Sequence, residues 1–240
     1  MGLSALIRRI VFPNSYSSDA YISYLRNQGV EIGEKCRIWS PNRTDIDVQR
    51  PHMLHIGNYV RITANVTILC HDFSRSVFCN MTGYGNVGEA RETWIGNNVF
   101  IGKGATILMG SHIGDNTIVG AGAIVSGRFP NDVVIAGNPA RIIMTIDELF
   151  EKRKNEEIAA AKLFAKNYYS RFKVWPNIYQ MSDAFSWMYV PHTEETLKDY
   201  PALFSTGTID TESFEESFLQ TKPIWPSFDD FLKECKKNDL

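Results

Sequence analysis

One histidine stands where a regular pattern of this sequence stops. In VTILCHDFSR, residues 66–75, the evenly spaced aliphatic residues of the neighbouring segments give way to Cys70, His71 and Asp72. Imidazole exchanges its proton near neutral pH, which makes histidine the usual general base for activating a hydroxyl group. We therefore select His71 as the candidate catalytic base. Asp72 is the candidate group that orients the imidazole, although Asp also commonly bonds nearby backbone and equally fits a cap of the following loop.

Cys70 suggests a second chemistry, a Cys–His pair that forms a covalent intermediate. Adjacent residues seldom make such a pair, because nucleophile and base must meet in hydrogen-bond geometry and usually come from separate segments. The cysteines also show neither a CxxC pair nor a metal-ligand spacing with histidine, and there are four of them: Cys36, Cys70, Cys79 and Cys235. We expect reduced thiols, no bound metal and no covalent role for Cys70.

A repeat of six residues surrounds this interruption. Branched aliphatic residues begin successive hexapeptides, whose fifth position is small or β-branched, at Ile56, Ile62, Ile68, Ile95, Ile101, Ile107, Ile113, Val119 and Val125, with an imperfect start at Ile32 and Ile38. A period of six fits no face of an α-helix, but it fits a short strand followed by a tight corner of Gly and Asn. Three such strands close one triangular coil, so the sequence predicts an all-β solenoid, a parallel β-helix with a continuous column of Ile and Val.

The spacing predicts three segments and one insertion. From Ile56 to Ile95 the separation is no multiple of six, so the register slips within residues 72–93, a polar and glycine-rich stretch that we expect to protrude as a loop. Residues 1–29 form an N-terminal helical segment, and residues 30–145 form the β-helix. Residues 146–240 form a helical, aromatic-rich extension, which we expect to be packed because its many rings need burial.

Capping residues predict the helix ends. Ser17 or Ser18 caps the N-terminal helix and Gly29 stops it. Thr145 and Glu148 form a capping box that opens a helix running to about residue 172. A last amphipathic helix covers residues 227 to about 236.

Composition excludes some partners. A formal net charge of −2 and a pI near 6.2 give no electrostatic footprint for nucleic acid. The apolar run SALIRRIVF, residues 4–12, is too short to span a bilayer and lacks a cleavage site, so no transmembrane segment is expected. We expect this run to pack on the domain, with peripheral membrane contact as the alternative. A cytoplasmic location follows from the reduced thiols.

The C-terminal end of the repeat carries a resemblance to a known family. VGAGAIVSGRFPNDVVIAGNPARII, residues 119–143, resembles the closing sequence of the coenzyme A-dependent acetyltransferases of the hexapeptide-repeat superfamily, which include galactoside and maltose acetyltransferases. The HDFS that follows a coil is similar to the branch of capsule, colanic acid and lipopolysaccharide O-acetyltransferases. The resemblance covers about residues 30–145. It implies a left-handed β-helix, a homotrimer with sites in grooves between neighbouring β-helices, and acetyl-CoA as the acyl donor.

The resemblance also implies roles for individual residues. His71 takes the place of the family's catalytic base, followed here by Asp72 instead of proline. The backbone of Ala121 takes the place that contacts the pantetheine arm, and Lys103 replaces a serine that touches the cofactor. Ser126 and Gly127 replace a threonine–lysine pair near the phosphates. Arg128 or Arg141 would restore the positive charge of the missing lysine. The residues implied to bind the donor are Gly102, Lys103, Gly120, Ala121, Ser126, Gly127, Arg128, Asn138, Pro139 and Arg141.

The implied reaction is acetyl transfer to a hydroxyl of a sugar or surface-polysaccharide precursor, by direct attack in a ternary complex. The 72–93 loop would close over the acceptor, with Tyr84 and Trp94 stacking on the sugar. Two alternatives stay open: N-acetylation of an amino sugar nucleotide, and a non-catalytic scaffold. A zinc site like that of gamma-class carbonic anhydrases would need a further histidine shortly after His71, and residues 72–93 hold none. His52, His55 and His112 fit packing or surface corners better than catalysis.

Overall fold

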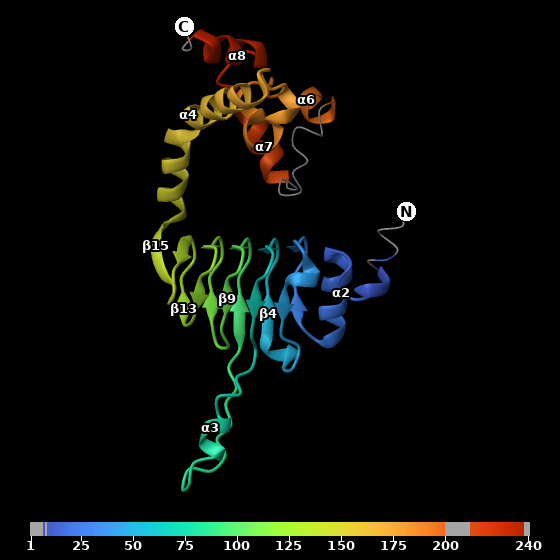
Figure 1. Cartoon of the computed structure of the whole chain (residues 1–240), viewed down its shortest axis with the longest axis vertical. Helices are drawn as coiled ribbons and strands as arrows, with labels where there is room; N and C mark the ends of the chain where they lie inside the picture. The colour runs from blue at the N-terminus through green and yellow to red at the C-terminus, as the bar shows by residue number, and fades with distance from the viewer. Residues whose placement is uncertain (1–6, 8, 200–211, 238–240) are drawn as a thin grey trace. The chain divides into compact units, whose positions relative to one another are not determined.

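The computed structural model describes Ile7, residues 9–199 and residues 212–237 of the 240-residue chain. Two compact units divide it, Met1–Glu151 and Lys152–Leu240. The first unit holds the stacked strands and the second consists of helices (Figure 1). Each is described by itself.

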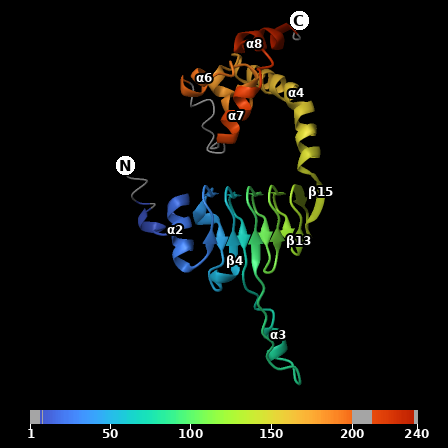
Figure 2. The same ribbon diagram turned by 180° about the vertical axis from the view of Figure 1, so that it is seen from behind.

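Three parallel sheets form the faces of the first unit, and each turn of the chain adds one strand to each sheet (Figures 1 and 2). Sheet A contains β1 (Glu31–Ile32), β4 (Leu54–Ile56), β7 (Thr93–Ile95), β10 (His112–Ile113) and β13 (Arg128–Phe129). Sheet B contains β2 (Arg37–Ile38), β5 (Arg61–Ile62), β8 (Phe100–Ile101), β11 (Ile118–Val119), β14 (Val133–Ala136) and the antiparallel β15 (Arg141–Thr145). Sheet C contains β3 (Asp45–Ile46), β6 (Thr67–Ile68), β9 (Thr106–Ile107) and β12 (Ile124–Val125). The predicted parallel β-helix is confirmed.

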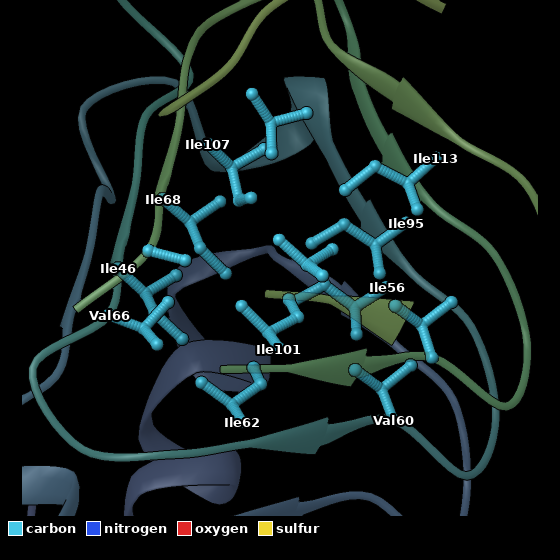
Figure 3. Packing of buried hydrophobic residues seen from close by; sticks show 14 of the residues in the cluster. Ile46, Ile56, Val60, Ile62, Val66, Ile68, Ile95, Ile101, Ile107 and Ile113 are labelled. Atoms are coloured by element: carbon cyan, nitrogen blue, oxygen red, sulfur yellow. The ribbon is translucent and has the colours of Figure 1, made fainter. Parts of the chain in front are cut away.

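The leading aliphatic residue of each hexapeptide points into the coil, where the three sheets enclose one column of side chains (Figure 3). Parallel pairing places equivalent residues above one another, as with Ile62 beside Ile101 and Ile68 beside Ile107. The small fifth positions are buried too, and Ser111 bonds its hydroxyl to the carbonyls of Leu108 and Val125. The six-residue spacing thus reflects one inward aliphatic side chain per face.

Glycine and asparagine are needed where sheet A turns into sheet B. A Cβ on Gly114 would lie 2.5 Å from the backbone nitrogen of Asn131 on the next coil. Asn97 Oδ1 accepts a bond from the Asn58 nitrogen at 2.9 Å, and Asp115 Oδ1 accepts one from the Asn97 nitrogen at 2.6 Å. These Gly-Asn corners therefore serve coil stacking.

The N-terminal helix α2 (Ser18–Gln28) closes one end of the column. Ser17 caps it by accepting a bond from Ala20 N, and Gly29 ends it at φ 102°, as predicted. Tyr21, Ile22 and Leu25 are buried in the same core as the first coil.

The apolar run before α2 departs from expectation. Ile7, Val11 and Phe12 are exposed, and Ile10 is 73% exposed. The expectation that residues 4–12 pack on the domain is therefore wrong for these side chains; residues 4–6 and 8 lie outside the described part. Among the described helices, none has the length and apolar character needed to cross a bilayer.

The second unit is reached through α4 (Ile146–Phe172). Thr145 and Glu148 form the predicted capping box, since each side chain accepts a bond from the other's backbone nitrogen. Shorter helices follow: η3 (Ile178–Gln180), α5 (Ser182–Phe185), η4 (Ser186–Met188), α6 (Glu194–Asp199), α7 (Glu212–Gln220) and α8 (Phe228–Lys237). A separate core of aromatic and small residues, including Tyr189, Trp225 and Phe231, holds them together. The extension after β15 is thus helical and has a core of its own.

Candidate active site

His71 lies on the edge where sheet C passes into sheet A, which we name the CA edge. The segment from 69 to 71 follows β6, and the chain then leaves the coil as a long arm that carries α3 (Ser76–Cys79) (Figures 1 and 2). The arm returns at β7, where Thr93 Oγ1 donates to Leu69 O at 2.9 Å. The interruption of the repeat is thus the predicted protruding loop, and His71 stands on the rigid coil at its root.

The carboxylate that contacts this histidine is Asp47, which lies one coil earlier on the same edge. Asp47 Oδ2 accepts a hydrogen bond from His71 Nδ1. The Asp47 side chain is only 6% exposed, whereas that of His71 is 20% exposed. Its second oxygen, Oδ1, accepts a bond from Gln49 N at 2.8 Å, which fixes the plane of the carboxylate. Asp47 therefore holds the ring from the protein side and leaves the other nitrogen toward the surface.

Hydrogen bonds keep Asp47 ionised despite its burial. Burial acts to raise the pKa of Asp47, but bonds from Gln49 N, from His71 and from Cys70 outweigh it and hold the pKa below its usual value. An ionised carboxylate can only accept hydrogen bonds, so the proton of the shared bond resides on His71 Nδ1. In the neutral ring, Nε2 then carries a lone pair. This is the tautomer that a general base needs.

Cys70 completes the surroundings of Asp47. Its backbone nitrogen and its thiol both donate to Asp47 Oδ2, at 3.0 and 3.2 Å, and the residue is fully buried. Burial and the adjacent carboxylate raise the pKa of Cys70 to about 11. The thiol is therefore a neutral donor and a poor nucleophile at neutral pH, in agreement with the sequence-based expectation.

Asp72 has a different place from the one expected. Its side chain lies at the surface, and Oδ1 accepts a bond from Ser74 N at 2.6 Å. That bond forms a turn at the start of the arm and lowers the pKa of Asp72. The role of orienting His71 thus moves from Asp72 to Asp47, and Asp72 caps the loop.

Trp94 and Tyr84, the two candidates for stacking on the sugar, have different surroundings. Trp94 lies on the outer face of β7, where its ring stacks on His55 at 3.9 Å between centroids and faces His112 at 6.3 Å on the other flanking strand. The indole is 40% exposed, and its proposed role in stacking on the sugar stays a prediction. Tyr84 lies exposed on the arm with its ring 6.3 Å from that of Phe78, and its role stays a prediction.

The residues implied to bind the donor fall on two edges. The first is the edge where sheet B passes into sheet C, which we name the BC edge. The residues at matching corners of successive coils on this edge are Gly102, Lys103, Gly120, Ala121, Asn138 and Pro139, and Arg141 lies just beyond them at the start of β15. Gly122 N donates to Lys103 O at 2.9 Å, so these corners stack directly. Ser126, Gly127 and Arg128 lie instead on the CA edge with His71. The width of sheet C separates the two groups within one chain.

The root of the arm is fixed by two arginines. Arg50 Nη1 donates to Glu89 O, which ties the returning strand of the arm to the segment that bears Asp47. Arg91 pairs with Glu89 at 2.8 Å and packs over Gly110, where a Cβ would lie 3.0 Å from its side chain. The arm itself exposes six apolar residues: Phe73, Val77, Phe78, Met81, Tyr84 and Val87. The arm is therefore anchored beside His71 and has an apolar surface of its own.

Sequence reasoning missed Asp47 because its segment keeps the hexapeptide pattern poorly. β3 pairs with β6 so that Ile46 lies beside Ile68. Once that register is known, Asp47 and the segment from 69 to 71 follow equivalent strands at the same edge. The available signal was Asp47 itself, an acidic residue directly after the sheet C strand of the coil that precedes the histidine-bearing coil.

Comparison with known proteins agrees with this architecture. Residues 92–127 match the family model described as bacterial transferase hexapeptide (six repeats). Protein CapG of Staphylococcus aureus is 39% identical over 123 residues, which cover 51% of this chain and 70% of that protein. The chain belongs to the bacterial hexapeptide-repeat transferases.

Other relatives in this family bear the name of an activity. The galactoside O-acetyltransferase of Escherichia coli (strain K12) is 38% identical over 101 residues, covering 39% of this chain but only 44% of that protein. A solved structure of galactoside acetyltransferase in complex with coenzyme A is 25% identical and covers 61% of this chain and 84% of its own, with a TM-score of 0.43. The family assignment makes this chain a transferase, and these named relatives are acetyltransferases. The left hand of the coil stays an expectation of the family resemblance.

Proposed function

We propose that this protein transfers an acetyl group from acetyl-CoA to a hydroxyl group of a sugar, with His71 as general base. The observation that carries the proposal is the His71–Asp47 pair on the CA edge, because it leaves a lone pair on Nε2 at the surface of a transferase scaffold. The galactoside O-acetyltransferase of Escherichia coli, 38% identical where it aligns, supports a sugar hydroxyl as acceptor.

The reaction follows from the tautomer. Nε2 of His71 takes the proton of the acceptor hydroxyl while its oxygen attacks the thioester carbonyl. The resulting imidazolium is stabilised by the Asp47 carboxylate through Nδ1. When the tetrahedral intermediate collapses, the carbon–sulfur bond breaks and the imidazolium returns the proton to the leaving thiolate. The products are the acetyl ester and the free thiol of coenzyme A.

The BC edge suits a long, narrow and anionic donor. Gly104 and Gly122 have nothing within 4 Å of an added Cβ, so the surface beside these corners is open. Lys103 is exposed between stacked glycine corners and supplies a positive charge for a phosphate. The residues present therefore fit coenzyme A, with Ala121 offering exposed backbone for close approach and Gly102 packed beneath it, where a Cβ would lie 2.6 Å from Ala121 N.

The division of site residues between two edges supports a homotrimer. A complete site would form where the CA edge of one chain meets the BC edge of its neighbour, so His71 and the donor-binding corners would come from different copies. The apolar arm residues, exposed in the single chain, would be covered by the neighbouring copy. In that arrangement the arm would enclose the acceptor, and the exposed Tyr84 is the candidate for stacking on it.

Purified protein incubated with acetyl-CoA and a panel of sugars tests this function. We expect release of free thiol that depends on the sugar, and a product heavier by one acetyl group in the mass spectrum. An ester bond that is cleaved by mild alkali distinguishes O-acetylation from acetylation of an amine. A protein that neither binds coenzyme A nor acetylates any sugar of the panel would instead be a scaffold.

Cys70 gives a prediction that separates the two chemistries. Cys70→Ser keeps a donor to Asp47 Oδ2, so we expect kcat to stay within about tenfold of the wild type, the effect of altering one hydrogen bond whose acceptor keeps a partner. A covalent mechanism through this thiol would lose activity by several orders of magnitude. Steady-state kinetics checks this, and intact-mass analysis during turnover should show unmodified enzyme.

A further inference from the structure

The second unit carries an aromatic face that the acetyl-transfer reaction does not use. Phe164, Tyr168 and Phe172 follow one another at four-residue intervals on α4, so they lie on one face of the helix. The rings of Tyr168 and Phe172 are 4.6 Å apart between centroids, and Phe172 is 57% exposed. These rings, together with Asn167, Ser170 and Arg171, line a hollow of about 570 Å³.

The charge of this segment is positive. Residues 158–181 contain four cationic side chains, at Lys162, Lys166, Arg171 and Lys173, and no acidic residue. Lys162 is neutralised by Glu234 of α8. Arg171 lies within the lining of the hollow and is exposed, so a ligand there meets a guanidinium group.

The mixture of side chains points to one class of ligand. The lining joins aromatic rings to an amide, a hydroxyl and a guanidinium. Sugar rings offer apolar C–H faces for aromatic rings and a rim of hydroxyls for planar polar groups. A guanidinium binds carboxylate or phosphate with two parallel hydrogen bonds.

We propose that this face of α4 binds an anionic glycan, a chain of sugars that bears carboxylate or phosphate groups. The choice of a carbohydrate rests on the proposed sugar acetylation. The three rings span about 12 Å along the helix axis, so they offer contacts to more than one sugar unit. Phe172 supplies the exposed ring and Arg171 the charge. The second unit thereby binds a polymeric acceptor of the proposed reaction.

Binding of a galacturonate hexamer to the full-length protein, measured by calorimetry without acetyl-CoA, tests this site. Uncharged maltohexaose is the comparison ligand. We expect Arg171→Gln to weaken galacturonate binding by at least about tenfold, because a charged hydrogen bond is lost, and Phe172→Ala to weaken it several-fold. Arg153→Gln and Phe150→Ala are matched controls on exposed positions of the same helix, outside the hollow, and should bind as the wild type does.

Three results would overturn the proposal. In the first, the wild-type protein binds neither hexamer, or binds both with equal affinity. In the second, the control variants lose as much affinity as Arg171→Gln and Phe172→Ala do. In the third, the protein binds phosphatidylglycerol vesicles and does not bind the glycan. The last result would assign the face to a lipid surface. Acetylation of a single-sugar acceptor by the same variants separates this inference from the proposed function. Glycan binding without any acetylation would refute the function alone, and acetylation without glycan binding would refute this site alone.

Discussion

His71→Ala is expected to lower kcat for acetyl transfer by roughly 10²- to 10⁴-fold, the contribution of a positioned general base. Nε2 is the only ring nitrogen available for the acceptor proton, because Nδ1 is bound to Asp47. The Michaelis constant for acetyl-CoA should change little, because the imidazole acts on the acceptor hydroxyl and the substitution alters none of the residues implied to bind the donor. Thiol-release kinetics at saturating donor and acceptor measures the effect.

His112→Ala is the matched control for that substitution. It removes an imidazole from the outer face of sheet A, where the ring lies beside Trp94. Activity near that of the wild type is expected, with a similar thermal unfolding temperature for both variants. If His71→Ala kept full activity on the best acceptor, general base catalysis by this residue would be excluded.

Asp47→Asn is expected to lower kcat by roughly 10²- to 10⁴-fold, although Asp47 touches no substrate in the proposed reaction. An amide can donate to Nδ1 as well as accept from it, so it permits the tautomer in which Nε2 carries the proton. That tautomer cannot accept the hydroxyl proton. Asp72→Asn is the matched control, and it should retain activity because Asp72 bonds the Ser74 backbone.

The same substitution has a consequence for stability that depends on pH. The pKa of Asp47 is lowered in the folded protein, so its ionised form stabilises the fold above the unfolded-state pKa of about 4. This contribution is lost as the pH falls through the folded-state pKa. Urea unfolding at pH 7 and at decreasing pH below about 4 should therefore show the wild type losing its advantage over Asp47→Asn. A difference that is independent of pH would contradict the ionised state of this carboxylate.

The fold could be predicted from the sequence because the position whose side chain points into the coil recurs every six residues. Ile95, Ile101 and Ile107 each sit on a different face, and their spacing alone implies three strands per coil. His71 could be selected because the pattern stops beside it. Asp47 could not, since its contact depends on the stacking of β3 on β6, and the irregular segment around β3 conceals that register.

Side-chain packing explains the other differences. The sequence places Trp94 next to the arm, but parallel register sets His55 and His112 on the flanking strands, where both rings stack beside the indole. The helices of the second unit follow from their caps, as at Thr145 and Glu148. The hollow on α4 could not be predicted in this way, because it depends on which side of the helix the neighbouring elements cover.

A double-mutant cycle between His71 and Asp47 tests the proposed catalytic pair most directly. Values of kcat are measured for the wild type, His71→Gln, Asp47→Asn and the double variant, with folding verified by circular dichroism. If Asp47 acts only through the imidazole, the double variant will be no slower than His71→Gln alone. Losses that multiply in the double variant would show that the two residues act independently and would contradict their assignment as base and orienting carboxylate.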